Sequence, residues 1–196
     1  MQFTTDDFDV STIQLPENRK INGRGKAAHL PEAKLNELFN ALPEQWQPVF
    51  AVAYFTGARI SEALTLEAKD IHDDRIIFSA KKTKTKKDRH ALIHPVLRSV
   101  LTKMTIPAGY MPDGTKGYLF PATHHHAKRG TALTRQAAHN VLRKTCDELW
   151  GEGHGVSTHS SRRSFATNLA AAGVPPAKIS KLLGHKEACV TDRYIG

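Results

Sequence analysis

Cysteine is scarce in this sequence, and long apolar runs are missing from it. Cys146 and Cys189 are the two cysteines among 196 residues, too few for the disulfide framework of a small secreted domain. No apolar run approaches the roughly 18 residues that a membrane-spanning helix needs, and we find no signal peptide. We therefore expect a cytoplasmic protein without a membrane partner, in which both thiols are inert.

Acidic residues are also in deficit. Lysine and arginine number 28 against 19 aspartates and glutamates, which gives a net charge of +9 and a pI near 9.7. This balance favours a polyanionic partner, although some basic enzymes have none. Hydrophobic residues make up 40% and charged residues 24%, values typical of a globular protein with one core.

Apolar spacing indicates a mainly helical fold with one small sheet. Residues 1–29 are polar and lack periodicity, so we expect a flexible basic arm ahead of a single domain over residues 30–196. Alternation predicts two antiparallel strands joined by a basic hairpin, which makes the fold class α+β. The helices are expected at about 31–42, 45–56, 59–66, 95–103 and 134–150, with two more near the C-terminus, and the strands at 75–78 and 90–93.

The last forty residues bring together side chains that suit a phosphate. His159 and Arg162 are three apart and would share one helix face. A second short helix should end at Gly184, just before His185, and Tyr194 follows nine residues later. Arginine and histidine can donate to phosphate oxygens, and a phenol can attack phosphorus.

Arg59 adds a cation from the first half of the chain. It follows Gly57 at the expected start of a helix, where free backbone N–H groups already favour an anion. Glu62 lies one turn further on and either pairs with Arg59 or faces solvent. The sequence leaves both readings of Glu62 open.

Two stretches resemble a known family. His159-x-x-Arg162, Leu183-Gly184-His185 and Tyr194 resemble the C-terminal signature of the tyrosine recombinases, also called the phage integrase family. The segment from Thr56 to Leu64, TGARISEAL, resembles the first arginine box of that family. The boxes occur in the family's order over residues 30–195, which implies the recombinase catalytic fold.

The resemblance implies a reaction on double-stranded DNA. Tyr194 would attack a scissile phosphate and form a 3′-phosphotyrosine, while Arg59, Arg162 and His185 stabilise the phosphorane. His159 would accept the proton of Tyr194 or donate to the phosphorane. The bond energy stays in the phosphotyrosine, so the resemblance implies neither ATP nor a metal cofactor.

The resemblance also implies a catalytic lysine on the basic hairpin. In the family this lysine lies eight residues before the end of a strand; Leu92 holds that place here and points to Lys84, with Lys82 and Lys86 as alternatives. The lysine would protonate the leaving 5′ oxygen. The other basic residues are expected to contact DNA phosphates unless the hairpin is merely a solvated loop; they are Lys81, Lys82, Lys86, Lys87 and Arg89.

The resemblance further implies a homotetramer on DNA, and it leaves the DNA site and accessory DNA-bending proteins open. An arm of 29 residues is too short for the N-terminal domain that family members usually carry. We therefore expect either an excised catalytic domain or a small family member, without the C-terminal docking segment that often follows the tyrosine.

Other functions remain as alternatives. A type IB topoisomerase shares the chemistry, and a noncatalytic DNA-binding regulator would share the basic charge. The three histidines at 124–126 do not predict a zinc site, because adjacent histidines cannot readily converge on one ion.

Overall fold

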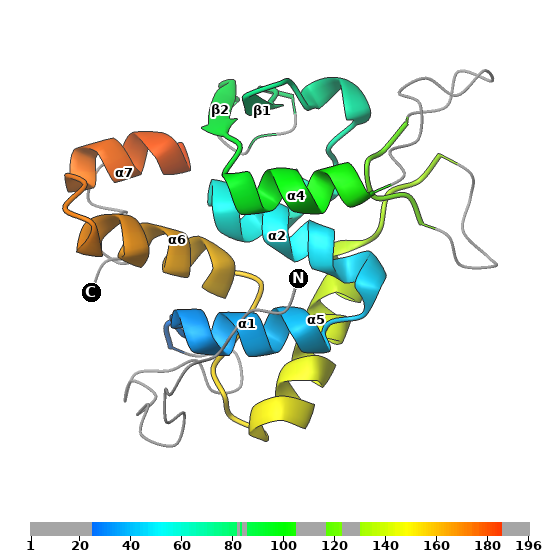
Figure 1. Ribbon diagram of the computed structural model, residues 1–196, viewed down its shortest axis with the longest axis vertical. Coiled ribbons are helices and arrows are strands. Elements are labelled where there is room, and N and C mark those ends of the chain that lie inside the picture. The colour runs from blue at the N-terminus through cyan, green and yellow to red at the C-terminus, as the bar shows by residue number, and fades with distance from the viewer. Residues whose placement is uncertain (1–24, 82, 84–85, 105–116, 123–129, 186–196) are drawn as a thin grey trace.

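Seven α-helices and two strands make up the computed structural model, which describes residues 25–81, 83, 86–104, 117–122 and 130–185 (Figure 1). The expected mainly helical fold with a small antiparallel sheet is confirmed. Within the described residues, none of the helices is both long and apolar enough to cross a membrane. The helices are α1 (Glu32–Ala41), α2 (Gln47–Thr56), α3 (Ile60–Leu64), α4 (Pro95–Lys103), α5 (Arg135–Trp150), α6 (Ser160–Ala171) and α7 (Pro176–Leu183). Two 3-10 turns, η2 (Glu44–Trp46) and η3 (Ala68–Asp70), and the strands β1 (Arg75–Phe78) and β2 (Arg89–Leu92) complete the set.

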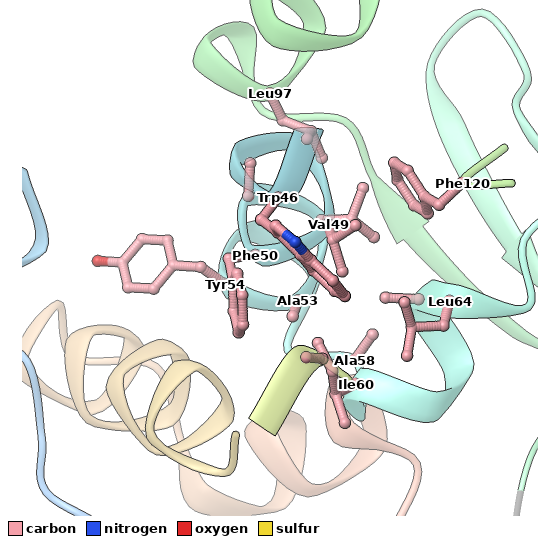
Figure 2. Packing of buried hydrophobic residues seen from close by; sticks show 14 of the residues in the cluster. Trp46, Val49, Phe50, Ala53, Tyr54, Ala58, Ile60, Leu64, Leu97 and Phe120 are labelled. Atoms are coloured by element: carbon pink, nitrogen blue, oxygen red, sulfur yellow. The ribbon is translucent and has the colours of Figure 1, made fainter. Parts of the chain in front are cut away.

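Helix α2 forms the centre of the main core, because almost all of its residues are apolar. Val49, Val52 and Ala53 are completely buried, and the helix packs against α3, α4 and α6. Figure 2 shows side chains such as Leu97 of α4 and Leu64 of α3 gathered around it. This burial on several sides fixes the C-terminal end of α2, where the candidate site begins.

The two strands form an antiparallel pair in which Phe78 lies opposite Arg89. Alternate residues face the core, so Ile76 and Phe78 of β1 are buried together with Arg89 and Ala91 of β2. Strand β2 begins one residue earlier than the sequence predicts. Arg89 therefore belongs to the sheet and not to the hairpin.

Helices α6 and α7 form a smaller apolar cluster beside α2. Ala166 of α6 packs with Ile179 and Leu183 of α7, and all three are fully buried. Helix α6 also packs directly on α2, and Figure 1 shows α6 and α7 next to each other. This arrangement brings the end of α7 close to the end of α2.

The segment just before α1 is held against α6. Ala28 is 1% exposed and donates its N–H to the carbonyl of Gly155 at 2.9 Å, and Arg163 donates to the carbonyl of Ala27 at 2.8 Å. The last residues of the expected flexible arm are therefore packed on the domain. Residues 1–24 lie outside the described part of the chain.

Candidate active site

The site begins at the turn between α2 and α3. Gly57 ends α2 in a left-handed conformation, with φ of 61°, which glycine adopts without the steric cost of a side chain. A Cβ at this position would lie 2.6 Å from a ring carbon of Phe165 and 2.8 Å from a methyl of Leu183. The glycine thus allows α6 and α7 to approach the turn and places Arg59 at the start of α3.

Arg59 is oriented by Glu62. The N–H of Arg59 donates to Oε2 of Glu62 at 3.1 Å, and its Nη1 donates to Oε1 at 2.8 Å. The structure therefore answers the question that the sequence left open: Glu62 pairs with Arg59 and is 2% exposed. The Arg59 side chain is 23% exposed, so an anion in solution can reach it.

Arg162 lies in the third position of α6 and is almost completely buried, at 1% exposure. Its Nη1 donates to the carbonyl of Gly57 at 2.8 Å, and its Nη2 donates to the carbonyl of Leu183 at 2.6 Å. Both acceptors lie at helix C-termini, which carry partial negative charge. Arg162 therefore links the end of α2 to the end of α7.

Arg89 makes a second link between the same two helix ends. Its Nη1 donates to the carbonyls of Thr56 at 2.9 Å and Leu182 at 3.3 Å, and its Nη2 donates to Glu62 at 3.4 Å. We expected Arg89 to contact DNA together with the hairpin lysines. The structure differs: the side chain is 7% exposed and its guanidinium lies over the ring of Phe78.

His185 follows α7 directly. Gly184 ends the helix with φ of 67°, and the N–H of His185 donates to the carbonyl of Ser180 at 3.0 Å. Burial, and after it the charges of Arg162 and Arg59, lower the pKa of His185 to about 4. The imidazole is therefore neutral at pH 7 and lies within electrostatic reach of both arginines.

His159 stands at the N-cap position of α6, three residues before Arg162, and not within the helix on a shared face as the spacing predicts. It is exposed, whereas Arg162 is buried. The structure thus gathers Arg59, Arg162 and His185 around the ends of α2 and α7, and it places His159 at the solvent side of the first turn of α6.

The comparison with protein families gives the decisive observation. The model of the phage integrase family matches residues 29–196. This chain belongs to that family.

Related sequences carry consistent names. This phage integrase family chain is 30% identical over 183 residues to the tyrosine recombinase XerD of Corynebacterium glutamicum, an alignment that covers 85% of this chain and 57% of XerD. It is 32% identical over 152 residues to XerD of Mycobacterium tuberculosis, which covers 74% of this chain and 46% of that protein. The chain spans about half the length of the curated relatives that it matches.

Solved structures share the fold of this integrase family chain. The integrase of transposon Tn1549, solved with a circular intermediate DNA, superposes with a TM-score of 0.71 at 20% identity and covers 87% of this chain and 62% of that one. XerH bound to its difH substrate gives 0.66 at 21% identity, covering 85% and 49%. The catalytic domain of bacteriophage HP1 integrase gives 0.59 at 23% identity, covering 86% and 87%.

Other residues of the predicted site lie partly beyond the described structure. Tyr194, Lys82 and Lys84 fall outside the described residues, so their roles stay predictions. Lys86 and Lys87 are exposed, as is Lys81. These three lysines are therefore accessible to a polyanion.

Hydrogen bonds within the hairpin support the base of the loop that carries these lysines. Asp88 accepts from the N–H of Ala80 at 2.6 Å, and the Thr83 hydroxyl donates to the carbonyl of Lys87 at 2.9 Å. Thr83 is buried although its neighbours at 81 and 86–88 are exposed. These bonds connect Ala80 to Asp88 and Thr83 to Lys87 across the described ends of the hairpin.

Among the described residues, no three histidine, cysteine or carboxylate side chains cluster at metal-binding distance. His154, which lies downstream of the histidine run, pairs with Asp147 at 3.3 Å. Residues 124–126 are outside the described part. Cys146 is buried, and burial raises the pKa of its thiol to about 12, so the thiol is unreactive at neutral pH.

Sequence reasoning missed the internal position of Arg89. The available signal was the alternation of β2: Arg89 and Ala91 are two residues apart, so they share the buried face of the strand. Starting the strand at His90 assigned Arg89 to the basic hairpin. A strand beginning at Arg89 would have directed its side chain toward the core.

Proposed function

We propose that this chain is the catalytic domain of a site-specific DNA recombinase or integrase. The observation that carries the proposal is the convergence of Arg59, Arg162 and His185, from three separate motifs, at the ends of α2 and α7. Two guanidiniums and a neutral imidazole suit the oxygens of one phosphate, because the arginines supply charge and the imidazole supplies a hydrogen bond.

In the proposed reaction the Oη of Tyr194 attacks the scissile phosphorus. The new bond joins this oxygen to phosphorus, and the bond from phosphorus to the 5′ oxygen breaks. His159 takes the phenolic proton, and Lys84 gives a proton to the leaving 5′ oxygen. Arg59, Arg162 and His185 stabilise the charge on the phosphorane.

Reversal completes the cycle. The 5′ hydroxyl of a partner strand attacks the 3′-phosphotyrosine, which restores the phosphodiester and the free tyrosine. Because the phosphotyrosine bond retains the energy of the broken phosphodiester, the proposal requires neither ATP nor a metal ion. Exposed Lys81, Lys86 and Lys87 contribute phosphate contacts outside the reacting centre.

The proposal extends to assembly and location. The exchange of strands between two duplexes calls for several active sites, so we propose a homotetramer on double-stranded DNA, working at the nucleoid in the cytoplasm. The mass of complexes on DNA with one and two sites, measured by sedimentation, tests the assembly. A single protomer on every DNA would contradict it.

The test uses nicked duplexes carrying candidate sites, from which the cleaved end can diffuse away. Denaturing gels should show a covalent protein–DNA adduct with the parent protein and none with Tyr194→Phe, which removes only the phenolic oxygen. Adducts that persist in Tyr194→Phe would refute the assignment. Strand exchange that depends on paired sites supports a recombinase, whereas plasmid relaxation without such sites would identify a topoisomerase.

A further inference from the structure

Arg89 contacts three of the helices around the proposed site. From strand β2 its guanidinium reaches the last residue of α2 through the carbonyl of Thr56, the carboxylate of Glu62 in α3, and the carbonyl of Leu182 in the last turn of α7. These contacts span 33, 27 and 93 positions in the sequence. One side chain thus joins four elements that are distant along the chain.

Arg89 and Arg162 bridge the same two helix ends side by side. Arg162 binds the carbonyls of Gly57 and Leu183, and Arg89 binds those of Thr56 and Leu182, each one residue earlier. Helix C-termini attract cations, so each arginine stabilises the approach of two like-charged ends. The spacing between α2 and α7 therefore depends on both guanidiniums.

Two further contacts tie Arg89 to the residues expected to bind phosphate. Glu62 uses Oε1 for Arg59 and Oε2 for Arg89, so one carboxylate holds both cations. A Cβ placed on Gly184 would lie 3.2 Å from the Cδ of Arg89, which shows that the stem of Arg89 lies against the residue just before His185. Arg89 is thus in contact with the supports of both Arg59 and His185.

We propose that Arg89 is a positioning residue of the active site, which sets the distance of His185 from Arg59 and Arg162 and does not itself touch DNA. This inference rests on the proposed function for its effect on cleavage. The two Nη atoms of Arg89 already donate to three acceptors, one of which is the Glu62 carboxylate that balances its charge. Lysine could not replace it, since an ammonium lacks the planar fork that reaches several acceptors at once.

The experiment compares Arg89→Met and Arg89→Lys with a matched control, Arg163→Met. Methionine keeps an unbranched stem beside Gly184 and removes the guanidinium that lies over Phe78, whereas lysine keeps a positive charge beside Glu62. Arg163 is also partly buried and donates to a backbone carbonyl, that of Ala27, which belongs to neither of the two helix ends that Arg89 links. Each variant is assayed well below its own unfolding midpoint.

The first measurement is single-turnover adduct formation on a nicked duplex, together with DNA affinity. A displacement near 1 Å costs about 10²-fold in rate, so Arg89→Met should cleave about 10²-fold more slowly while binding DNA as the parent does. The cleavage rate of Arg89→Lys should lie between those of Arg89→Met and the parent, and the rate of Arg163→Met should equal that of the parent. Cleavage by Arg89→Lys at the parental rate would overturn the proposal, and this variant decides the matter if Arg89→Met does not fold. A loss of affinity with a shallower salt dependence would identify a phosphate contact and would also overturn it.

The second measurement needs no DNA. In the free protein, NMR titration of the His185 ring should give a midpoint that moves up toward the ordinary histidine value in Arg89→Met, because the imidazole has become less buried and has moved away from the two arginines. The midpoint should stay in place in Arg163→Met. An unchanged midpoint in Arg89→Met would refute positioning. If the parent protein forms no adduct on any DNA, the proposed function fails, and this titration still decides the role of Arg89.

Discussion

Replacing Gly57 by alanine should destabilise the domain by two separate effects. The residue has φ of 61°, and its new methyl would lie 2.6 Å from Phe165 and 2.8 Å from Leu183. The left-handed conformation costs an L-residue about 1–2 kcal/mol, and overpacking adds about 1–3 kcal/mol. We therefore expect Gly57→Ala to lower the free energy of unfolding by about 2–5 kcal/mol.

Gly173→Ala is the matched control for this prediction. Gly173 also has positive φ, at 80°, but a Cβ there would have no neighbour within 4 Å. Gly173→Ala should therefore lower the free energy of unfolding only by the cost of the left-handed conformation, about 1–2 kcal/mol. For a domain of this size 1 kcal/mol shifts the Tm by about 2–4 °C, so Gly57→Ala should melt about 2–12 °C below Gly173→Ala, measured by circular dichroism.

A double mutant isolates the steric part. Phe165→Val removes the ring carbons that the new methyl would meet at 2.6 and 3.0 Å. Gly57→Ala should therefore cost less in the Phe165→Val background, and the coupling free energy from a urea-unfolding cycle should be nonzero. Equal losses for Gly57→Ala and Gly173→Ala, or strict additivity with Phe165→Val, would refute the argument that close packing requires this glycine.

Three further predictions concern charge and protons. DNA affinity should fall by about 10³- to 10⁵-fold between about 50 and 200 mM salt if six to ten phosphates are contacted, and a flat filter-binding titration would contradict the nucleic-acid interface. The pKa of His185 is about 4 in the folded protein and near 6.5 in the unfolded chain, so between these pH values the unfolded chain binds a proton that the folded protein does not. The free energy of unfolding should therefore be highest above about pH 6.5 and should decrease as the pH falls toward 4. Urea unfolding at several pH values should show this decrease, and it should be smaller in His185→Gln. Lys84→Ala should cleave normal DNA about 10²- to 10⁴-fold more slowly than the parent. It should cleave a substrate with sulfur at the 5′ bridging position nearly as fast as the parent, because a thiolate leaves without a proton. Arg162→Ala should remain slow on both substrates, and an equal Lys84→Ala defect on both would exclude a general acid.

The sequence predicted those elements whose boundaries depend on local chemistry. Strand β1 and helix α4 have the predicted bounds, and α4 begins at Pro95, whose fixed φ suits a first turn. The helix expected over residues 45–56 is divided instead into a 3-10 turn and α2. The physical reason is Pro48, which lacks an N–H and is accommodated in the first turn of a helix.

The contacts that assemble the site cannot be predicted from the spacing of residues in the sequence. The motif residues Arg59, Arg162 and His185 were identified from the sequence, and the structure brings them together. The bonds that fix them join Arg162 to Gly57 across 105 positions and Arg89 to Leu182 across 93. Such pairings follow from how α6 packs on α2 and how α7 packs on α6 and β2, and neither periodicity nor charge predicts them.

The two arginine bridges also give this domain an order of assembly. Helix α7 comes last among the described elements, and it supplies the carbonyls of Leu182 and Leu183 as well as the route to His185. As the chain emerges from the ribosome, α2, β2 and α6 can fold first, but Arg89 then lacks one of its three acceptors and Arg162 lacks one of its two. A nascent chain that ends before α7 therefore holds both arginines without the carbonyls of Leu182 and Leu183, and the link between the ends of α2 and α7 forms only when this last described helix docks.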